Sequence, residues 1–141
     1  MKKGYTLIEI LIVATIIVLL TAVAVVSYSN FLKQSRDSKR KTDLEQIRAA
    51  LEMYRSDKDS YFDYALGNCS SYTALTSGSP KYIQSMPSDP KSSSGFYYSC
   101  EVSASDYTVG TYLETGTESP SCGNCGTTTA CNYCVGPYGK K

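Results

Sequence analysis

The cysteines carry the most recognisable chemistry in this chain, because four of its six cysteines form two closely spaced pairs. Cys122 and Cys125 are separated by five residues from Cys131 and Cys134. Four such thiolates can close a structural zinc site, one pair can act as a redox dithiol, or the four can form two disulfides. Zinc sites usually separate their pairs by about 12–20 residues, so we favour disulfides that staple a segment rich in Gly and Thr.

The remaining two cysteines, Cys69 and Cys100, would tie a loop to a strand if they were bonded to each other. Six cysteines in a small domain favour disulfides and an oxidising, extracytoplasmic location. The four C-terminal cysteines alone allow three pairings, and the sequence does not choose among them. We expect no resident cofactor, with one alternative, a zinc ion held by Cys122, Cys125, Cys131 and Cys134.

The composition argues against an enzyme. The chain of 141 residues has no histidine, which removes the commonest general base and every His-containing metal site or catalytic triad. It also lacks a nucleophile-elbow motif and a phosphate-binding loop. A net charge of +1 gives no overall bias toward nucleic acid, while thirteen tyrosines favour contacts between protein surfaces.

Glu9 is a carboxylate at the start of a long apolar segment. From Ile10 to Val26 the sequence has no charge, and counted from Tyr5 the segment matches the roughly 20 residues that cross a bilayer as a helix. An unpaired charge in lipid costs on the order of 3 kcal/mol, so Glu9 needs a cation. A cut after Gly4 would supply one, the new α-amino group of Tyr5.

Two simpler interpretations of this segment are an ordinary secretory signal and a plain membrane anchor. A signal has an apolar core of about 7–15 residues and a small-residue cleavage site, which Ala22-Val23-Ala24 would provide. The apolar run here is longer than that and leads directly into more helix. Neither interpretation explains Gly4 and Glu9 together.

The N-terminal stretch Met1-Lys2-Lys3-Gly4-Tyr5-Thr6-Leu7-Ile8-Glu9 resembles the class III leader of type IV pilins and of type II secretion pseudopilins. In that family a basic leader ends in Gly and is followed by an aromatic residue, Thr, Leu, an apolar residue and Glu. The resemblance implies cleavage between Gly4 and Tyr5 by a prepilin peptidase and N-methylation of Tyr5. It also implies that Thr6, Leu7 and Glu9 act in assembly.

The same resemblance implies a function. The chain is expected to be a structural subunit of a type IV pilus or a type II secretion pseudopilus, polymerised with its own copies through its N-terminal helix. Expected partners are the peptidase, an inner-membrane assembly platform and the membrane. The N-terminus would be cytoplasmic, the domain extracytoplasmic, and the filament extracellular or periplasmic. Alternatives are a minor or competence pilin that binds DNA or a surface, and a tethered zinc- or thiol-active protein.

Helical periodicity continues beyond the apolar segment. Residues 27–57 contain no Pro or Gly, and four apolar residues recur at three- and four-residue spacing on one face: Leu44, Ile47, Leu51 and Tyr54. The pairs Glu45 with Arg48 and Asp37 with Lys41 have the spacing of helical ion pairs. We therefore predict one helix from about residue 5 to about residue 57, apolar all round in its first half and amphipathic in its second.

A basic cluster lies between these halves, formed by Lys33, Arg36, Lys39, Arg40 and Lys41. Basic flanks usually stay cytoplasmic, which conflicts with the expected orientation, but six cysteines argue for an exported domain. The cluster fits a solvated helix face or a headgroup contact, and the alternatives are ion pairs between subunits and a DNA track.

The rest of the chain predicts loops and two strands. Residues 61–80 have the composition of a loop, and Pro87 and Pro90 predict an extended segment with a turn, similar to the segment ahead of the first strand in major pseudopilins. Residues 96–102 and 107–114 alternate as strands, and the linker between them is short enough for a hairpin. A lone hairpin is marginal in water, so it must pack on the amphipathic helix face.

The expected fold class is therefore α+β, a long N-terminal helix packed on a small antiparallel sheet, pilin-like, with a cysteine-rich C-terminal loop. The expected boundaries are a leader at 1–4, a transmembrane and assembly helix at 5–26, and its amphipathic continuation at 27–58. A globular domain with loop and hairpin follows at 59–118, and then the cysteine-rich tail at 119–141.

Overall fold

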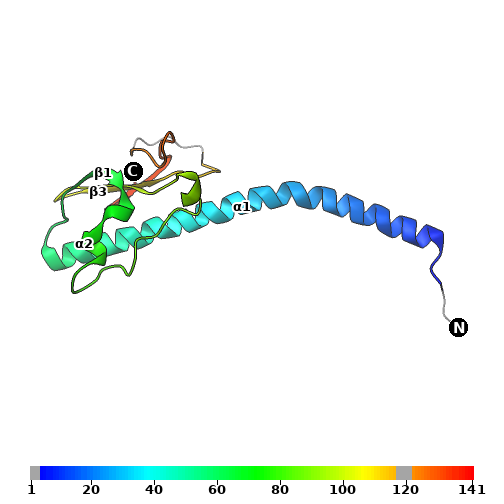
Figure 1. The fold of residues 1–141 in the computed structure, drawn as a ribbon, viewed down its shortest axis with the longest axis horizontal. Coiled ribbons are helices and arrows are strands. Elements are labelled where there is room, and N and C mark those ends of the chain that lie inside the picture. Colours follow the sequence, from blue (N-terminus) through cyan, green and yellow to red (C-terminus); the bar gives the residue numbers. More distant parts are fainter. Residues whose placement is uncertain (1–3, 117–121) are drawn as a thin grey trace. The chain divides into compact units, whose positions relative to one another are not determined.

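The structure, a computed structural model, describes residues 4–116 and 122–141. The chain forms two compact units, residues 1–35 and residues 36–141. Helix α1, Leu7–Lys58, begins in the first unit and ends in the second (Figure 1). This confirms the predicted single long helix. Residues 1–3 of the expected leader, and residues 117–121, which span the expected boundary between the globular domain and the tail, lie outside the described residues.

The first unit exposes apolar side chains over the described part of its helical segment. Large aliphatic side chains from Leu7 to Val23 are 50–84% exposed. Among the described residues, α1 is the one helix long and apolar enough to cross a membrane. A surface of this composition is stable only in lipid or against other apolar surfaces.

The second unit contains a five-stranded antiparallel sheet whose strands follow one another in sequence order. Figure 1 shows this sheet lying along the C-terminal part of α1. The strands are β1 Tyr64–Asn68, β2 Ser99–Val102, β3 Tyr107–Thr111, β4 Tyr133–Gly136 and β5 Gly139–Lys140. The β2–β3 pair is the predicted hairpin, with Cys100 opposite Val109 and Val102 opposite Tyr107.

The core lies between α1 and the sheet, on the helix face that the periodicity predicted. Leu44, Ile47 and Leu51 are fully buried, and Tyr54 packs against them at the edge. Val109 of β3 and the valines of the neighbouring strands close the other side. The β2–β3 hairpin, which would be marginally stable alone in water, is thus stabilised by burial of its apolar side chains against the helix, as we expected.

Aromatic rings from α1 and from residues 61–72 add to this core. The Tyr54 and Tyr72 rings each contact Phe62 edge-on, at centroid distances of 5.1 and 5.3 Å, and Tyr64 contacts Tyr72 at 4.3 Å. Edge-to-face packing of this kind adds about 0.5–1.5 kcal/mol per pair beyond the buried area. Many of the tyrosines in the sequence are therefore interior residues of the domain.

Two predictions about loops were wrong. Residues 61–80 contain β1, the 3-10 helix η1 (Cys69–Ser71) and helix α2 (Thr73–Thr76), and the cysteine-rich tail supplies β4 and β5. β1 is an edge strand whose register shifts between Tyr64 and Gly67, which breaks the alternation that reveals a strand. β4 and β5 are too short to show a period of two. A further 3-10 helix, η2 (Ser92–Ser94), precedes β2.

Candidate functional site

Thr6 and Glu9 form a reciprocal cap at the beginning of α1. The Thr6 N–H and hydroxyl donate to Oε2 of Glu9 at 3.0 and 2.9 Å, and the Glu9 N–H donates to Oγ1 of Thr6 at 3.4 Å. This is a capping box, in which a Thr at the N-cap and a Glu three residues later satisfy each other's N–H groups. The capping box gives the Glu9 carboxylate local donors, while no ion pair in the described part of the chain includes it.

The residues expected to be processed lie just ahead of this cap. Gly4 is exposed and has no atom within 4 Å of the position that a side chain would occupy. Tyr5 is 83% exposed and precedes the first helical turn. Leu7, the other residue expected to act in assembly, is 84% exposed. The backbone on both sides of the expected cut is therefore accessible.

Further along α1, the threonine hydroxyls of the apolar segment donate hydrogen bonds to backbone carbonyls of the preceding turn. The Thr15 hydroxyl donates to the Ile12 carbonyl at 2.8 Å, and the Thr21 hydroxyl donates to the Ile17 carbonyl at 2.9 Å. A shallow apolar groove of about 420 Å³ is lined by Leu11, Ala14, Thr15, Val18 and Leu19. The segment thus presents aliphatic surface with one carboxylate at its beginning.

A buried charge cluster marks the start of the second unit. Arg40 is fully buried and donates to both carboxylate oxygens of Asp89, at 2.8 Å from Nε and 3.0 Å from Nη2. Its Nη1 donates to Asp37 at 2.9 Å and to Glu114 at 3.0 Å. A buried guanidinium is tolerated only when it is paired and hydrogen-bonded in this way.

Glu114 is the second centre of the cluster. Arg36 approaches it with Nε and Nη2 at 2.6 and 2.8 Å, and the Lys91 ammonium lies 2.7 Å from Oε2. The hydrogen bond from Arg36 holds the pKa of the Glu114 carboxyl far below its usual range, against the opposing effect of burial, and Lys91 and Arg40 contribute in the same direction. Glu114 therefore stays ionised.

Asp37 completes the cluster by binding backbone as well as charge. It accepts from the N–H groups of Glu114 and Thr115 at 2.9 and 2.8 Å and from the Thr115 hydroxyl at 2.7 Å. Burial tends to raise the pKa of Asp37, but these hydrogen bonds and the one from Arg40 outweigh it and lower the pKa. The segment after β3 is thereby fastened to the helix.

The cluster corrects two predictions about the basic residues. Asp37 pairs with Arg40, and the Lys41 ammonium lies 5.5 Å from the centre of the Tyr133 ring. Arg36 and Arg40 are occupied by acids, so they form neither a solvated face nor a DNA track together with Lys39 and Lys41. The predicted pair of Glu45 with Arg48 is present at 3.2 Å.

The tail cysteines are joined in two nested disulfides, Cys122 with Cys134 and Cys125 with Cys131, at Cα–Cα distances of 6.2 and 5.0 Å. Cys69 is joined to Cys100, which links η1 to β2. All six sulfurs are therefore paired. The structure thus assigns the pairing in the tail that the sequence left open. Cys134 lies opposite Gly110 in the β3–β4 register, and Sγ of Cys122 lies 2.7 Å from the position of a Cβ at Gly110.

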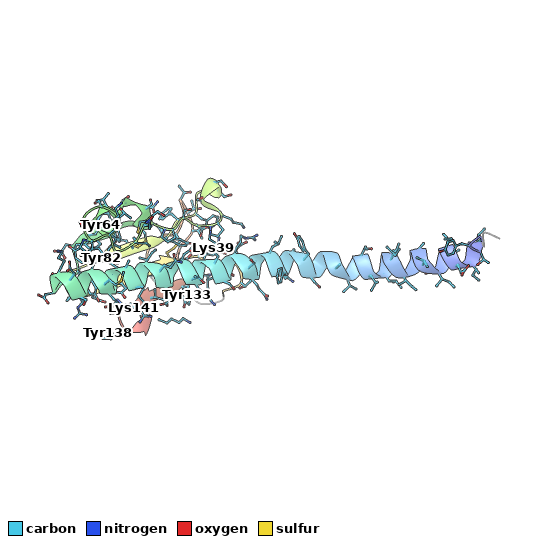
Figure 2. The ribbon with its side chains drawn as sticks, turned by 90° about the horizontal axis from the view of Figure 1, so that it is seen from below. Lys39, Tyr64, Tyr82, Tyr133, Tyr138 and Lys141 are labelled. Carbon is cyan, nitrogen blue, oxygen red and sulfur yellow. A yellow bond between two sulfur atoms is a disulfide. The ribbon has the colours of Figure 1, made fainter. Side chains whose placement is uncertain are left out.

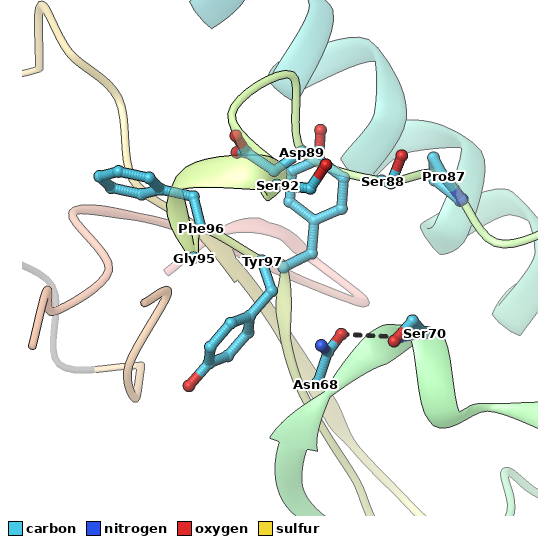
Figure 3. A pocket seen from close by; sticks show the side chains of 10 residues that line it. Asn68, Ser70, Pro87, Ser88, Asp89, Ser92, Gly95, Phe96 and Tyr97 are labelled. Atoms are coloured by element: carbon cyan, nitrogen blue, oxygen red, sulfur yellow. Dashed lines mark hydrogen bonds between the residues drawn. The ribbon is translucent and has the colours of Figure 1, made fainter. Parts of the chain in front are cut away.

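A cavity of about 290 Å³, lined by both polar and apolar side chains, opens beside Asn68, Ser70, Asp89 and Tyr97 (Figure 3). The Asn68 side chain accepts from the Ser70 N–H at 2.9 Å. Both carboxylate oxygens of Asp89 are already bound by Arg40, and one also accepts from the Lys91 N–H. The cavity therefore offers no carboxylate that could serve as a general base. Over residues 4–116 and 122–141, no cluster of His, Cys, Asp or Glu is arranged to hold a metal ion.

Comparisons with known proteins match the N-terminal segment and, with one relative, most of the length of the chain. Residues 1–25 match the model described as the prokaryotic N-terminal methylation motif. The type IV major pilin protein PilA of Myxococcus xanthus is 40% identical over 64 residues, which cover 45% of this chain and 29% of that protein. The type IV major fimbrial protein FimA of Dichelobacter nodosus is 30% identical over 114 residues, covering 79% of this chain and 71% of that protein. The chain belongs to the type IV pilin family.

No solved structure matches this pilin. Its alignment with the Myxococcus relative spans less than a third of that protein's length, whereas its alignment with the Dichelobacter relative extends into the sheet-bearing unit. These relatives are pilins and fimbrial proteins by name, and the long apolar helix, the small antiparallel sheet and the disulfides are those of a pilin.

Proposed function

We propose that this pilin is the structural subunit of a type IV pilus. A prepilin peptidase cuts it between Gly4 and Tyr5, Tyr5 is N-methylated, and an inner-membrane platform moves the subunit from the bilayer into a filament of its own copies. The observation that carries this proposal is the exposed apolar surface of α1 with Glu9 at its beginning. Burial of that surface against other subunits contributes about 25 cal/mol per Å² removed from water.

Glu9 has a specific part in this scheme. Before assembly its carboxylate is held by the Thr6 N–H and hydroxyl, which satisfies its hydrogen bonds but leaves its charge uncompensated. In the filament the α-amino group of Tyr5 from another copy supplies the missing cation. An unpaired charge in that dry bundle would cost several kcal/mol, so docking in the wrong register is disfavoured.

The test is the replacement of Glu9 by Ala and by Gln. Both variants should insert into the membrane and be recovered in the membrane fraction, because removing a charge favours insertion. Neither should yield filaments that can be sheared from the cell surface. Glu45→Gln is the matched control, since it removes an exposed carboxylate of the second unit and should leave filaments unchanged. Normal filaments from Glu9→Ala would exclude the docking role.

The proposed topology places the N-terminus in the cytoplasm and residues 36–141 outside it. Three disulfides support an oxidising location for the second unit. Alkaline phosphatase fused after Lys141 should be active, and a fluorescent protein that folds only in the cytosol should stay dark at the same position. The reverse pattern would refute this orientation.

A subunit of a type II secretion pseudopilus would use the same helix and the same carboxylate. We favour the pilus because the relatives named above are a pilin and a fimbrial protein. Deletion of the chain should abolish surface filaments and leave protein secretion intact. Loss of secretion with filaments retained would identify the pseudopilus instead.

We also propose that the tail cysteines act as structural disulfides and bind no zinc. Intact mass should be lower than that of the reduced chain by two hydrogens per disulfide and unchanged by a chelator. A mass increase that matches one zinc ion and disappears with chelator would support the metal site.

A further inference from the structure

The second unit has two unpaired cations near the beginning of its helical segment. Lys39 and Lys41 are exposed, and neither forms an ion pair within the described residues. The acids of the neighbouring charge cluster are already bound by Arg36, Arg40 and Lys91, so they leave the charge of the two lysines uncompensated. We call Lys39 and Lys41 the basic end of the unit.

Unpaired acids lie around the other end of the helix. Asp59 directly follows α1, Asp63 directly precedes β1, and Glu101 lies on β2. Glu101 joins the other two because its neighbour Val102 pairs with Tyr64 at the start of β1. These three acids are exposed, and none of them forms an ion pair or a side-chain hydrogen bond in the part of the chain that the structure describes. We call the three acids the acidic end of the unit.

The basic end and the acidic end are far apart. Figure 2 shows Lys39 at one end of the second unit, with Tyr64 and Tyr82 at the opposite end. The path along α1 from Lys39 to Asp59 is about 30 Å long, at about 1.5 Å per residue. The carboxyl end of a helix also carries a partial negative charge, which adds to that of the acidic end. The second unit therefore has an electrostatic polarity along the helix.

The other charges near the acidic end largely cancel. Lys58 pairs with Asp57 at 3.0 Å. Arg55 donates to the same tyrosine hydroxyl that donates to Glu52, so these two opposite charges lie close together. Lys81 is exposed and lies next to the tyrosine that binds Asp57, so it offsets part of the remaining negative charge. Three unpaired carboxylates against this one lysine leave the end acidic.

Charges separated in this way favour one mode of contact between copies of the chain. Like ends repel each other, and unlike ends attract each other. A contact between unlike ends leaves each copy with one end free for a further copy, so it propagates a filament and does not close a dimer. A closed dimer with two-fold symmetry would instead place the same end of both copies together.

We propose that the acidic end of one copy binds the basic end of the next copy in the filament. The inference depends on the proposed filament function and adds to it a second contact between subunits, made by the sheet-bearing unit. The apolar helix supplies a surface with little direction of its own, whereas the two charged ends favour one register between neighbouring subunits.

The test reverses the charge of each end in the full chain and measures the yield of filaments sheared from the cell surface. Lys39→Glu with Lys41→Glu gives a chain with two acidic ends, and Asp63→Lys with Glu101→Lys gives a chain with two basic ends. Asp59 is left in place because its φ of 62° is a conformation that Lys rarely adopts. Each variant expressed alone should yield at least about fivefold fewer filaments, since like charges that face each other across an interface are strongly disfavoured.

Expression of both variants in the same cells should restore the filaments. The unlike ends of the two variants attract each other, so the recovered filaments should contain both chains in similar amounts by mass spectrometry. Glu45→Lys is the matched control, because it reverses an exposed charge between the two ends and should leave the yield unchanged. Circular dichroism in uncharged detergent confirms that each variant is folded.

Three results would overturn the proposed contact. They are a wild-type yield from either variant alone, a yield from the two folded variants together that is as low as from each alone, and an equal loss in Glu45→Lys. Absence of filaments from the wild type would instead refute the filament function itself.

Discussion

Arg40 of α1 and Asp89 of the loop before β2 form a two-point ion pair in the interior of the domain. Both side chains are almost completely excluded from solvent, and their atoms meet at 2.8 and 3.0 Å. The pair fixes the loop carrying Pro87 and Pro90 against the helix, close to the boundary between the two units. It adds a polar attachment between α1 and the sheet-bearing part of the second unit to the apolar core that lies between them.

Replacing Arg40 by Met should strongly destabilise the second unit. The variant leaves Asp89, Asp37 and Glu114 without a shared buried cation, and breaking such a pair typically costs about 3–5 kcal/mol. Chemical unfolding of the full chain in uncharged detergent, followed by circular dichroism, measures the effect. Arg48→Met is the control, since its partner Glu45 is half exposed and the expected cost is below about 1 kcal/mol. Equal costs for the two variants would contradict the account of the cluster.

The charge cluster also predicts how stability depends on pH. The folded-state pKa values of Glu114 and Asp37 lie below their ordinary values, so the stabilisation is fully present above about pH 4.5 and is lost as the pH falls below it. The free energy of unfolding should therefore be flat near neutrality and decrease in acid. In Glu114→Gln the stability at neutral pH should be lower, and the decrease in acid shallower. An unchanged acid slope in that variant would rule out Glu114 as its source.

Gly110 on β3 should tolerate no side chain. A Cβ added there would lie 2.7 Å from Sγ of Cys122 and 3.0 Å from Sγ of Cys131, atoms that belong to different disulfides and are held by their bonds. Gly110→Ala is expected to cost about 1–3 kcal/mol through overpacking and to make the tail disulfides easier to reduce. Gly67→Ala on β1 is the control, because its Cβ would meet its nearest neighbour at 3.7 Å. Thermal unfolding should show a lower midpoint temperature for Gly110→Ala than for Gly67→Ala, and equal midpoints would contradict the overpacking.

Tyr98 and Tyr82 offer a comparison of the same hydrogen bond inside and outside the core. The Tyr98 hydroxyl donates to the buried Asp43, and the Tyr82 hydroxyl donates to the exposed Asp57, both at 2.6 Å. Tyr98→Phe removes a donor from a buried carboxylate and should cost about 1–3 kcal/mol, whereas Tyr82→Phe should cost well under 1 kcal/mol. Comparable losses in the free energy of unfolding would show that burial of Asp43 does not increase the contribution of its hydrogen bond.

The sequence predicted the elements whose signals are long and periodic. The face of Leu44, Ile47 and Leu51 recurs over several turns, so both the helix and the side that packs against the sheet could be predicted. The β2–β3 hairpin followed from alternation on both sides of a short linker. Both patterns lie within short stretches of sequence, and the structure confirms the elements that they predict.

The partners of Asp37 and Arg40 could not be predicted, because they are set by contacts distant in sequence. Spacing along the helix favoured Lys41 as the partner of Asp37, but Thr115 and the backbone beside it, 78 residues away, orient the carboxylate toward Arg40. The edge strand β1 and the two-residue strand β5 likewise depend on pairing with the adjacent strands β2 and β4. The pairing in the tail required that sheet before it could be assigned.

The central claim is that this pilin is processed at Gly4 and reassembled through its apolar helix. The most direct test is mass spectrometry of the N-terminal peptide from filaments sheared off the cell surface. We predict that the peptide begins at Tyr5 and carries one methyl group on its amino nitrogen. A peptide that begins at Met1, or one that begins beyond Ala24 as after an ordinary signal cleavage, would contradict the claim.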